Sequence, residues 1–383
     1  MKIPVLGLFG ISMKILAIGG GSMGRRRLRD LIYLNVGEVI LFEPVPERCA
    51  ETAAFFGVRG FTNFDEALAE GPGAITISTP PALHEGYVRK AMELGLHVFA
   101  EVPFVFTVEA LAEIAEKARS YDAVLGVSHT IRYYPPYRII HDALKDGVIG
   151  KPLYLEYSLG NHLADWHSYE NYRNYYVSDF RLGGAGMDMI LHELSPIQWW
   201  MGDIESVYAR LSKVSSLEIT GPDNHDVLLF FASGARGFFH HDVIERGTIG
   251  RHIRIAGEDG TLEWHQNLPT IRVYDGKQNR EYPFHEARDW HTALEASREM
   301  SGILSRQRSE SGQTASAEVP SFTYESCYLR EMRHFLEAAE DKHPYTMTDI
   351  NEELQTVRTF QAIVASSEMK REVPVEESLA KGA

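Results

Sequence analysis

The sequence predicts an α/β protein in which a doubly wound parallel sheet is followed by an α+β domain with a large, mostly antiparallel open sheet. Between residues 13 and 131, short Val/Ile-rich runs alternate with longer segments whose apolar residues recur at helical spacing, which is typical of a parallel sheet covered on both faces. After Tyr133-Tyr134-Pro135-Pro136 the apolar runs lengthen and alternate with hairpin signals such as Ser233-Gly234 and Asp275-Gly276, which indicate antiparallel strands.

The apolar runs of the first part give the order of its elements. The expected strands are KILAIG, EVILFE, AITIST, HVFAEV and AVLGVS, and the expected helices between them are 25–35, 46–56, 64–69, 84–94 and 108–120.

The second part is richer in strands. The expected strands include PLYLEYSLG, SVYARLSKV, HDVLLFFASG, ARGFFHHDVI, RHIRIAGEDGTLEWH and TIRVYDG. Residues 301–319 are rich in Ser, Gln and Gly and predict a loop, and two helices are expected to close the chain over 323–340 and 349–368.

Composition excludes several classes of function. The chain has 383 residues, with 38 Lys and Arg against 53 Asp and Glu, and this formal charge of -15 repels a nucleic-acid backbone. Its 44% hydrophobic and 24% charged residues are typical of a soluble globular protein, and no apolar run approaches a membrane span in length. Two cysteines in no metal-binding spacing indicate neither a disulfide framework nor structural zinc, and they favour a reducing, cytoplasmic setting.

A glycine-rich turn, Gly19-x-Gly21-x-x-Gly24, lies between the first expected strand and the helix after it. In a Rossmann domain the first glycine allows a tight turn, the second lets the backbone approach a pyrophosphate, and the third lets helix and strand pack closely. Glu43 follows the second strand, nineteen residues after Gly24, where an acid accepts hydrogen bonds from a ribose diol. We therefore expect NAD(H) at this turn.

The residues around this acid favour NAD over NADP. Pro44 follows Glu43 where a protein that binds a 2′-phosphate would carry Arg or Lys, although Arg48 lies nearby. Thr79-Pro80-Pro81 closes another strand and is expected beside the cofactor, at the carboxyl ends of the strands. The patterns divide the chain into an N-terminal extension (1–12), a Rossmann dinucleotide-binding domain (13–132) and a substrate-binding and oligomerisation domain with closing C-terminal helices (133–383).

Six segments together resemble the Gfo/Idh/MocA family of sugar and polyol oxidoreductases, over residues 13–375. They are GGGSMGRRRLRDL, STPPALHEGYVRKAMELGLHVFAEVP, IRYYPPYRIIHDALKDGVIGKPLYLEY, GGAGMDMILHELSPIQWWMG, IAGEDGTLEW and YLREMRHFLEA. The resemblance implies NAD(H) as the cofactor and a sugar, cyclic polyol or sugar derivative as the substrate. Together with the glycine turn, it gives an expected cofactor-binding set of Gly19, Gly21, Ser22, Met23, Gly24, Glu43, Thr79, Pro80, His84 and Glu101.

The resemblance also places the reacting groups on a helix of the second domain. The family's Asp-x-x-x-His falls on Asp188 and His192, which at this spacing share one helical face. His192 would take the hydroxyl proton, which suits imidazole because its pKa lies near working pH, and Asp188 would orient or tune it. The family's Glu-Lys-Pro is Glu101-Val102-Pro103 here, so the lysine that normally supplies a cation near the reacting oxygen is absent.

Val102 leaves three hypotheses open. An oxidoreductase could rely on His192, on another donor such as His162, His167 or Tyr176, or on the substrate itself. The cofactor could instead be retained while a glycosidic bond is cleaved through transient oxidation, as in some members of the family. The chain could also be a non-catalytic subunit that binds NAD and a sugar.

Residues 161–173 gather His, Trp, Tyr, Glu and Arg side chains. These offer stacking faces and hydrogen-bond donors suited to a sugar ring or a carboxylate, or they form a surface loop whose aromatic residues cover the sheet. The spacing of the histidines is unlike a zinc motif, and no metal is expected. The expected substrate-binding residues are Arg132, His162, Trp166, His167, Tyr172 and Arg173.

His240 and His241 are adjacent in an expected strand, so their side chains point to opposite faces of the sheet and one of them is a candidate for the site. The open face of this sheet carries aromatic and aliphatic residues that need covering. We therefore expect a homodimer or a homotetramer.

Overall fold

The computed structural model describes residues 13–165, 171–184, 186–247, 250–310, 322–340 and 343–376. Within these residues the chain forms two compact units. The first gathers 13–105, 113–133 and 291–350, and the second gathers the described parts of 106–112, 134–290 and 351–376. The division into 13–132 and 133–383 stays a prediction, because each unit collects separate stretches of the chain. The expected extension, 1–12, lies outside the described residues.

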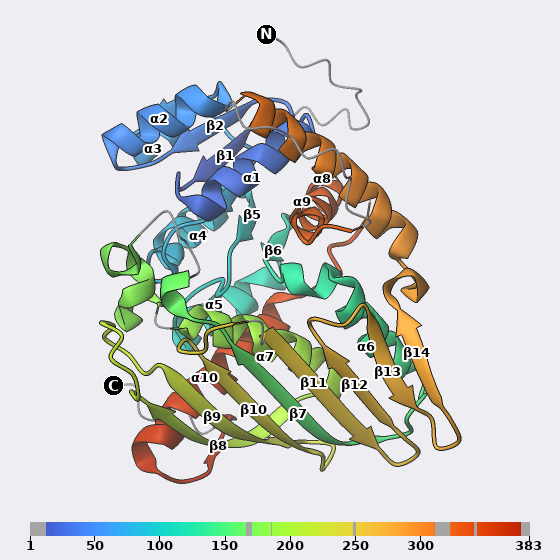
Figure 1. The fold of residues 1–383 in the computed structure, drawn as a ribbon. Coiled ribbons are helices and arrows are strands. Elements are labelled where there is room, and N and C mark those ends of the chain that lie inside the picture. The colour runs from blue at the N-terminus through green and yellow to red at the C-terminus, as the bar shows by residue number, and fades with distance from the viewer. Residues whose placement is uncertain are drawn as a thin grey trace. The chain divides into compact units, whose positions relative to one another are not determined.

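The first unit is built on a six-stranded parallel sheet, which confirms the predicted doubly wound sheet (Figure 1). Its spatial order is β3-β2-β1-β4-β5-β6, and the order of strands therefore reverses between β1 and β4. In open sheets of this kind, ligands bind at the carboxyl ends of the strands beside such a reversal. The strands are β1 (Ile15–Ile18), β2 (Val39–Phe42), β3 (Arg59–Phe61), β4 (Ala74–Ile77), β5 (His97–Ala100) and β6 (Leu125–Val127).

Helices follow the strands much as the apolar spacing predicts. Every residue of β1 is at most 1% exposed, because both faces of the sheet are covered, and this explains why the strand is apolar throughout rather than alternating. The helices are α1 (Ser22–Tyr33), α2 (Pro46–Phe56), α3 (Phe64–Ala69), α4 (His84–Glu93) and α5 (Val108–Ala118).

Two later helices, α8 (Trp290–Glu310) and α9 (Glu325–Ala339), contribute to the core of the first unit. The loop expected over 301–319 is wrong for 301–310, which belong to α8. Met300 and Ile303 are buried in the same core as Leu329 and Phe335 of α9, so tertiary packing overrides the Ser-rich composition there. Residues 311–319 of the expected loop lie outside the described residues.

The second unit contains a nine-stranded sheet, which confirms the predicted large and mostly antiparallel sheet. Its order is β14-β13-β12-β11-β7-β10-β9-β8-β15, and only β7 and β10 pair in parallel. The strands are β7 (Pro152–Gly160), β8 (Ile204–Ser212), β9 (Asn224–Phe231), β10 (Arg236–Asp242), β11 (Gly250–Gly257), β12 (Thr261–His265), β13 (Thr270–Tyr274), β14 (Asn279–Pro283) and β15 (Val373–Pro374).

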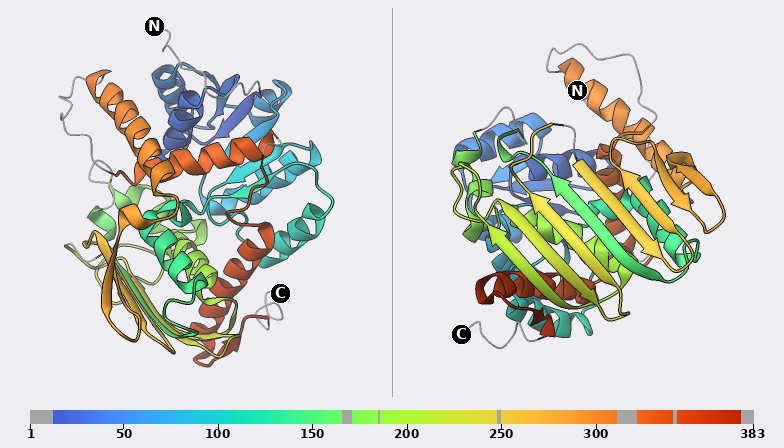
Figure 2. Two further views of the ribbon diagram at one scale, coloured as in Figure 1. Left: turned by 90° about the vertical axis from the view of Figure 1, so that its right-hand side faces the viewer. Right: turned by 60° about the horizontal axis from the view of Figure 1, so that its bottom comes forward.

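The helices of the second unit lie along one face of this sheet (Figure 2). They are α6 (Pro135–Lys145), α7 (Met187–Met201) and α10 (Ile350–Met369). The covered face is fully buried at residues such as Tyr157, Phe239 and Ile253, whereas Tyr154 and Leu228 on the other face are 37% and 44% exposed. None of the described helices is long and apolar enough to cross a membrane.

His240 and His241 point to opposite faces of the sheet, as the strand period predicts. His241 is fully buried. His240 lies half-buried on the other face, where its Nδ1 is 2.8 Å from Asp226 and its Nε2 is 3.1 Å from Asp242. Two carboxylate partners require both ring nitrogens to donate, and the hydrogen bond to Asp242 contributes most to raising the pKa of His240 to about 9.

Candidate functional site

The glycine turn between β1 and α1 is closed by two backbone contacts that leave no room for a side chain. Gly19 has φ +102°, and a Cβ there would lie 2.5 Å from the Ser78 carbonyl oxygen. A Cβ on Gly24 would lie 1.9 Å from the Gly19 carbonyl oxygen. Gly21 differs, because a Cβ on it would meet nothing within 4 Å. The turn is therefore tight at its two ends and open at Gly21, next to the first residues of α1, Ser22 and Met23.

Glu43, at the end of β2, holds this turn through its carboxylate. Its Oε2 accepts a hydrogen bond from the Gly20 backbone N–H at 2.8 Å, and its Oε1 accepts from Val45 N–H at 3.0 Å and from Arg48 at 2.7 Å. Burial alone would raise the pKa of Glu43, but these donors outweigh it and lower the pKa below its usual value. Because Oε2 accepts one bond from the protein, it keeps accepting capacity for a ribose hydroxyl.

Thr79 and Pro80 follow β4 at the point where the strand order reverses. His84, at the start of α4, is fully buried and joins this loop to the one after β5. One of its ring nitrogens lies 2.9 Å from the Thr79 carbonyl oxygen and the other 2.8 Å from the Pro103 carbonyl oxygen. Through these contacts His84 connects two loops at the carboxyl end of the sheet.

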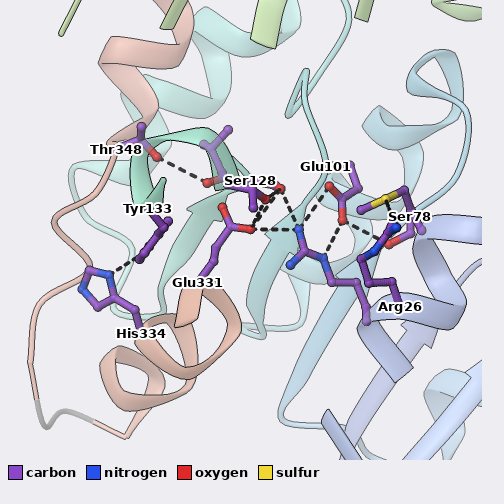
Figure 3. A network of polar contacts seen from close by, with 12 residues as sticks. Arg26, Ser78, Glu101, Ser128, Tyr133, Glu331, His334 and Thr348 are labelled. Carbon is purple, nitrogen blue, oxygen red and sulfur yellow. Dashed lines mark hydrogen bonds and ion pairs between the residues drawn. The ribbon is translucent and has the colours of Figure 1, made fainter. Parts of the chain in front are cut away.

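Glu101 follows β5 directly and belongs to a network of buried charges in the first unit. Figure 3 shows the carboxylates of Glu101 and Glu331 approaching the same region from different elements, with Ser128 beside them. The guanidinium of Arg27 occupies that region, with Nε 2.7 Å from Glu101 and Nη2 2.9 Å from Glu331. Burial raises the pKa of Glu331 to about 7, although Arg27 acts in the opposite direction.

In the second unit, a glycine run positions the start of α7. Gly184 packs directly against the backbone of two earlier residues, because a Cβ on it would lie 2.1 Å from the Tyr176 carbonyl oxygen and 2.6 Å from Val177 Cα. Tyr176, held there, donates its hydroxyl to Asp188 Oδ2 at 3.0 Å. Burial raises the pKa of Asp188 to about 6, and the Tyr176 hydrogen bond limits this rise. His192 lies one turn further along α7 and is half-buried.

Glu193, the residue after His192, enters a second buried network. Its Oε1 accepts two hydrogen bonds from Arg251, at 2.6 Å and 3.1 Å, and its Oε2 accepts from the hydroxyls of Tyr157 and Tyr137. Burial opposes ionisation of Glu193, but the Arg251 guanidinium outweighs it and holds the pKa of this carboxyl below its usual value. The backbone around His192 is thus tied to the sheet by a neutralised ion pair.

His225 and His241 form a buried pair beneath the N-cap of α7. His225 Nδ1 lies 3.1 Å from the His241 carbonyl oxygen, which can only accept, so His225 Nδ1 carries its proton. The same nitrogen lies 3.1 Å from His241 Nδ1, which therefore accepts, and His241 carries its proton on Nε2. Burial lowers the pKa of His225 to about 4 and that of His241 also falls far below its usual value. Both rings are neutral at neutral pH.

The predicted substrate-binding residues are spread over both units. Arg132, in the first unit, is buried and donates to the Met347 carbonyl oxygen at 2.7 Å. In the second unit, Tyr172 is buried, and the exposed Arg173 stacks 4.6 Å from its ring and pairs with Glu218 at 2.8 Å. His162 is half-buried, with Nδ1 4.0 Å from Asp165. Trp166 and His167 lie outside the described residues.

Among the described residues, no group of three or more His, Cys, Asp or Glu side chains is arranged to hold a metal ion.

Comparison with known proteins identifies both parts of the chain. Residues 13–129 match the oxidoreductase family with an NAD-binding Rossmann fold, and residues 137–263 match the GFO/IDH/MocA C-terminal domain. The chain belongs to the Gfo/Idh/MocA family. This confirms the resemblance found in the sequence, and residues 13–129 are an NAD-binding Rossmann domain of that oxidoreductase family.

Curated relatives of this Gfo/Idh/MocA protein are distant. The inositol 2-dehydrogenase of Acidothermus cellulolyticus is 27% identical over 300 residues, which cover 74% of this chain and 81% of that protein. The 1,5-anhydro-D-fructose reductase of Ensifer adhaerens is 24% identical over 292 residues, which cover 73% of this chain and 85% of that protein.

Solved structures share the fold of this Gfo/Idh/MocA protein. An oxidoreductase from Agrobacterium radiobacter, in complex with NAD+, L-tartaric acid and magnesium, is similar with a TM-score of 0.77 at 18% identity, covering 95% of this chain and 99% of that chain. A levoglucosan dehydrogenase in complex with NADH and levoglucosan gives 0.74 at 18% identity, with coverage of 95% and 99%.

Several residues of these networks escape sequence analysis. Gly20 occupies a variable position of the glycine motif, yet a Cβ there would lie 3.3 Å from Glu43 Oε2. Glu193 carried a usable signal: it stands among Ile190, Leu194 and Ile197 on the apolar face of α7, where a carboxylate needs a buried cation. No signal pointed to Arg251 as that cation, because the pairing joins distant parts of the chain.

Gly186 offers a direct test of how the histidine pair supports α7. It has φ +80°, and a Cβ there would lie 2.8 Å from His241 Cε1 and 3.3 Å from His225 Cε1. Gly57, which ends α2, is also in the left-handed region, with φ +67° and ψ +31°, and a Cβ on it would meet nothing within 4 Å. We expect Gly57→Ala to lower the free energy of unfolding by about 1–2 kcal/mol through its backbone alone, and Gly186→Ala to lower it by about 1–3 kcal/mol more through overpacking. Urea unfolding followed by circular dichroism measures both, and equal losses would show that the histidines move aside freely.

Proposed function

We propose that this Gfo/Idh/MocA protein is an NAD(H)-dependent oxidoreductase that transfers hydride between nicotinamide and a sugar, a cyclic polyol or a sugar derivative. The observation that carries the proposal is the glycine turn, open at Gly21 and fastened to the ionised Glu43, at the carboxyl end of the parallel sheet. Backbone N–H groups at the start of α1 suit a pyrophosphate, and Glu43 suits the adenosine ribose. NAD is favoured over NADP, because Glu43 repels a 2′-phosphate.

The residues proposed to hold the cofactor are those at the carboxyl ends of β1, β2, β4 and β5. When bound, the nicotinamide supplies a hydride donor or acceptor. His84 acts through its two contacts, since it keeps the Thr79 and Pro103 loops together. The thiols of Cys49 and Cys327 are reduced and buried, which suits the proposed cytoplasmic location.

His192 is the proposed proton acceptor for the substrate hydroxyl, and Asp188 the carboxylate that sets its environment. Imidazole accepts a proton near neutral pH, and α7 presents both groups one turn apart on the same face. The proposed substrate contacts are Arg132, His162, Trp166, His167, Tyr172 and Arg173. The inositol 2-dehydrogenase and 1,5-anhydro-D-fructose reductase relatives support a polyol or sugar substrate.

A second candidate function follows from Val102, which offers no cation at the position of the family's lysine. In that case NAD is retained and a glycosidic bond is cleaved through transient oxidation, with no net change in cofactor. A chain that binds NAD and a sugar without turnover is the remaining hypothesis.

A substrate panel separates these functions. We expect NADH to form when purified protein and NAD+ are mixed with at least one sugar or polyol, measured by absorbance. His192→Ala should lower kcat by about 10²–10⁴-fold, whereas His141→Ala on α6, stacked 3.9 Å from Trp199, should leave it within about twofold of wild type. Leaving-group release from an aryl glycoside without net NADH would favour the retained-cofactor function instead. Equal activity of wild type and His192→Ala would contradict the role given to His192.

The Tyr176–Asp188 hydrogen bond predicts a shift in pH dependence. Asp188 loses its proton near pH 6, so activity that needs its carboxylate should rise as pH increases through about that value. Tyr176→Phe removes a donor that lowers the pKa of Asp188, and the rising limb of kcat/KM should move to higher pH. Steady-state rates between pH 5 and 9 measure this limb. A limb that stays in place in the variant would exclude Asp188 as the group that titrates.

We also propose that a second copy of the chain covers the exposed face of the nine-stranded sheet. Tyr208 and Leu228 pair directly across β8 and β9 on this face and are 43% and 44% exposed. Leu228→Glu should lower the mass measured by light scattering toward the 43.2 kDa monomer, because it buries a charge in the contact. Val214→Glu is the matched control, since Val214 is 60% exposed but lies outside the strands. A wild-type protein of monomer mass would overturn this proposal.

A further inference from the structure

Arg27 lies on α1, three residues after the last glycine of the turn, and its guanidinium is fully buried. It meets Glu101 at two points: Nε is 2.7 Å from Oε1 and Nη2 is 3.2 Å from Oε2. A two-point contact between guanidinium and carboxylate fixes the plane of the acid as well as its distance. Arg27 therefore sets the orientation of the Glu101 side chain.

The rest of the network holds Arg27 from behind. Its Nη2 also donates to Ser128 Oγ at 2.7 Å and to Glu331 at 2.9 Å, and Thr130 donates to the same Glu331 oxygen at 2.6 Å. The guanidinium stacks 4.7 Å from the Phe99 ring centre. An arginine held on this many sides has little rotamer freedom left, so it is a rigid support.

Glu101 is the member of this network that reaches the surface of the first unit. Its side chain is 17% exposed, whereas those of Arg27 and Glu331 are 0% exposed. It stands at the carboxyl end of β5, where its backbone N–H donates to the Ile77 carbonyl oxygen and its carboxylate lies 3.5 Å from Ser78 Oγ. Arg27 can therefore affect a ligand by orienting Glu101, which lies beside the strand reversal at which dinucleotides bind.

We propose that Arg27 is a positioning residue for dinucleotide binding: it fixes the Glu101 carboxylate as an acceptor for hydroxyl groups of NAD(H). The proposal rests on the NAD(H) binding proposed above. Val102, which follows Glu101, carries no charge. The positive charge beside Glu101 comes instead from the buried Arg27. One helix thus serves the cofactor twice, through its first turn and through Arg27.

The alternative role for Arg27 is purely structural, as a clamp between α1 and α9 through Glu331. Substitutions of individual residues distinguish the two roles. Arg27→Lys keeps the charge but cannot make the two-point contact, and Glu331→Gln removes the ionic link to α9 while leaving the Glu101 contact intact. Arg29→Lys is the matched control, since Arg29 is a buried arginine of the same helix that pairs with Asp30 and Glu325.

The experiment is a fluorescence titration of the full-length protein with NADH, together with the thermal unfolding midpoint of each variant. We expect Arg27→Lys to weaken NADH binding at least about tenfold, because contacts to charged groups are worth this much or more. Arg29→Lys should stay within about twofold of wild type. Glu331→Gln should lower the unfolding midpoint while its NADH affinity stays within about twofold.

Two further variants keep the proposal testable if Arg27→Lys does not fold. Glu101→Asp keeps the charge and shifts the carboxylate, so positioning predicts a loss of NADH affinity as large as that of Glu101→Gln. Unchanged NADH affinity in Arg27→Lys, or in Glu101→Asp, would overturn the inference and leave the proposed function standing. Failure of the wild-type protein to bind NADH would overturn the proposed function, and this inference with it.

Discussion

The first unit depends on the contact between the backbones of Gly19 and Gly24. A Cβ on Gly24 would lie 1.9 Å from the Gly19 carbonyl oxygen, so α1 can start where it does only because that atom is missing. This start directs α1 along the sheet and brings its arginines to α9, where Arg26 and Arg29 donate to Glu325 at 2.9 Å and 2.8 Å. A single steric constraint at the end of β1 therefore fixes both the open turn at Gly21 and the position of Arg27.

Buried charge is the second theme of both units. Arg27 lies between Glu101 and Glu331 in the first unit, and Glu193 lies between Arg251 and two tyrosine hydroxyls in the second. Removing one partner of such a group leaves an uncompensated charge away from water, which is strongly destabilising. Each network is connected to a residue proposed to meet cofactor or substrate: Glu101 in one case and His192, next to Glu193, in the other.

Local patterns predicted the sheet classes, most helix ranges and the glycine turn, because these depend on residues close together in the chain. Gly19 and Gly24 do what the motif requires of them, in the turn and in close packing. Asp188 and His192 do lie on a helix, as expected. The hydrogen bond that Tyr176 donates to Asp188 was not predicted from the sequence.

What sequence analysis could not supply is pairing over long distances. Arg27 and Glu331 are 304 positions apart, and no local pattern marks either as the partner of the other. The loop predicted for 301–310 was wrong for a related reason, because burial of Met300 and Ile303 against α9 outweighs a composition typical of loops. The roles of individual site residues stay predictions, since they concern contacts with the proposed cofactor and substrate.

The stability of the second sheet depends on pH through the imidazolium of His240, which lies between Asp226 and Asp242. Its folded pKa, raised to about 9, exceeds the usual histidine value of 6.5, so the stabilisation it provides is complete below about pH 6.5 and fades as pH climbs through 9. In a basic medium the imidazole loses its proton, and its two ring nitrogens can no longer both donate to the carboxylates of β9 and β10. The end of that hairpin is where alkaline loosening of the sheet would begin.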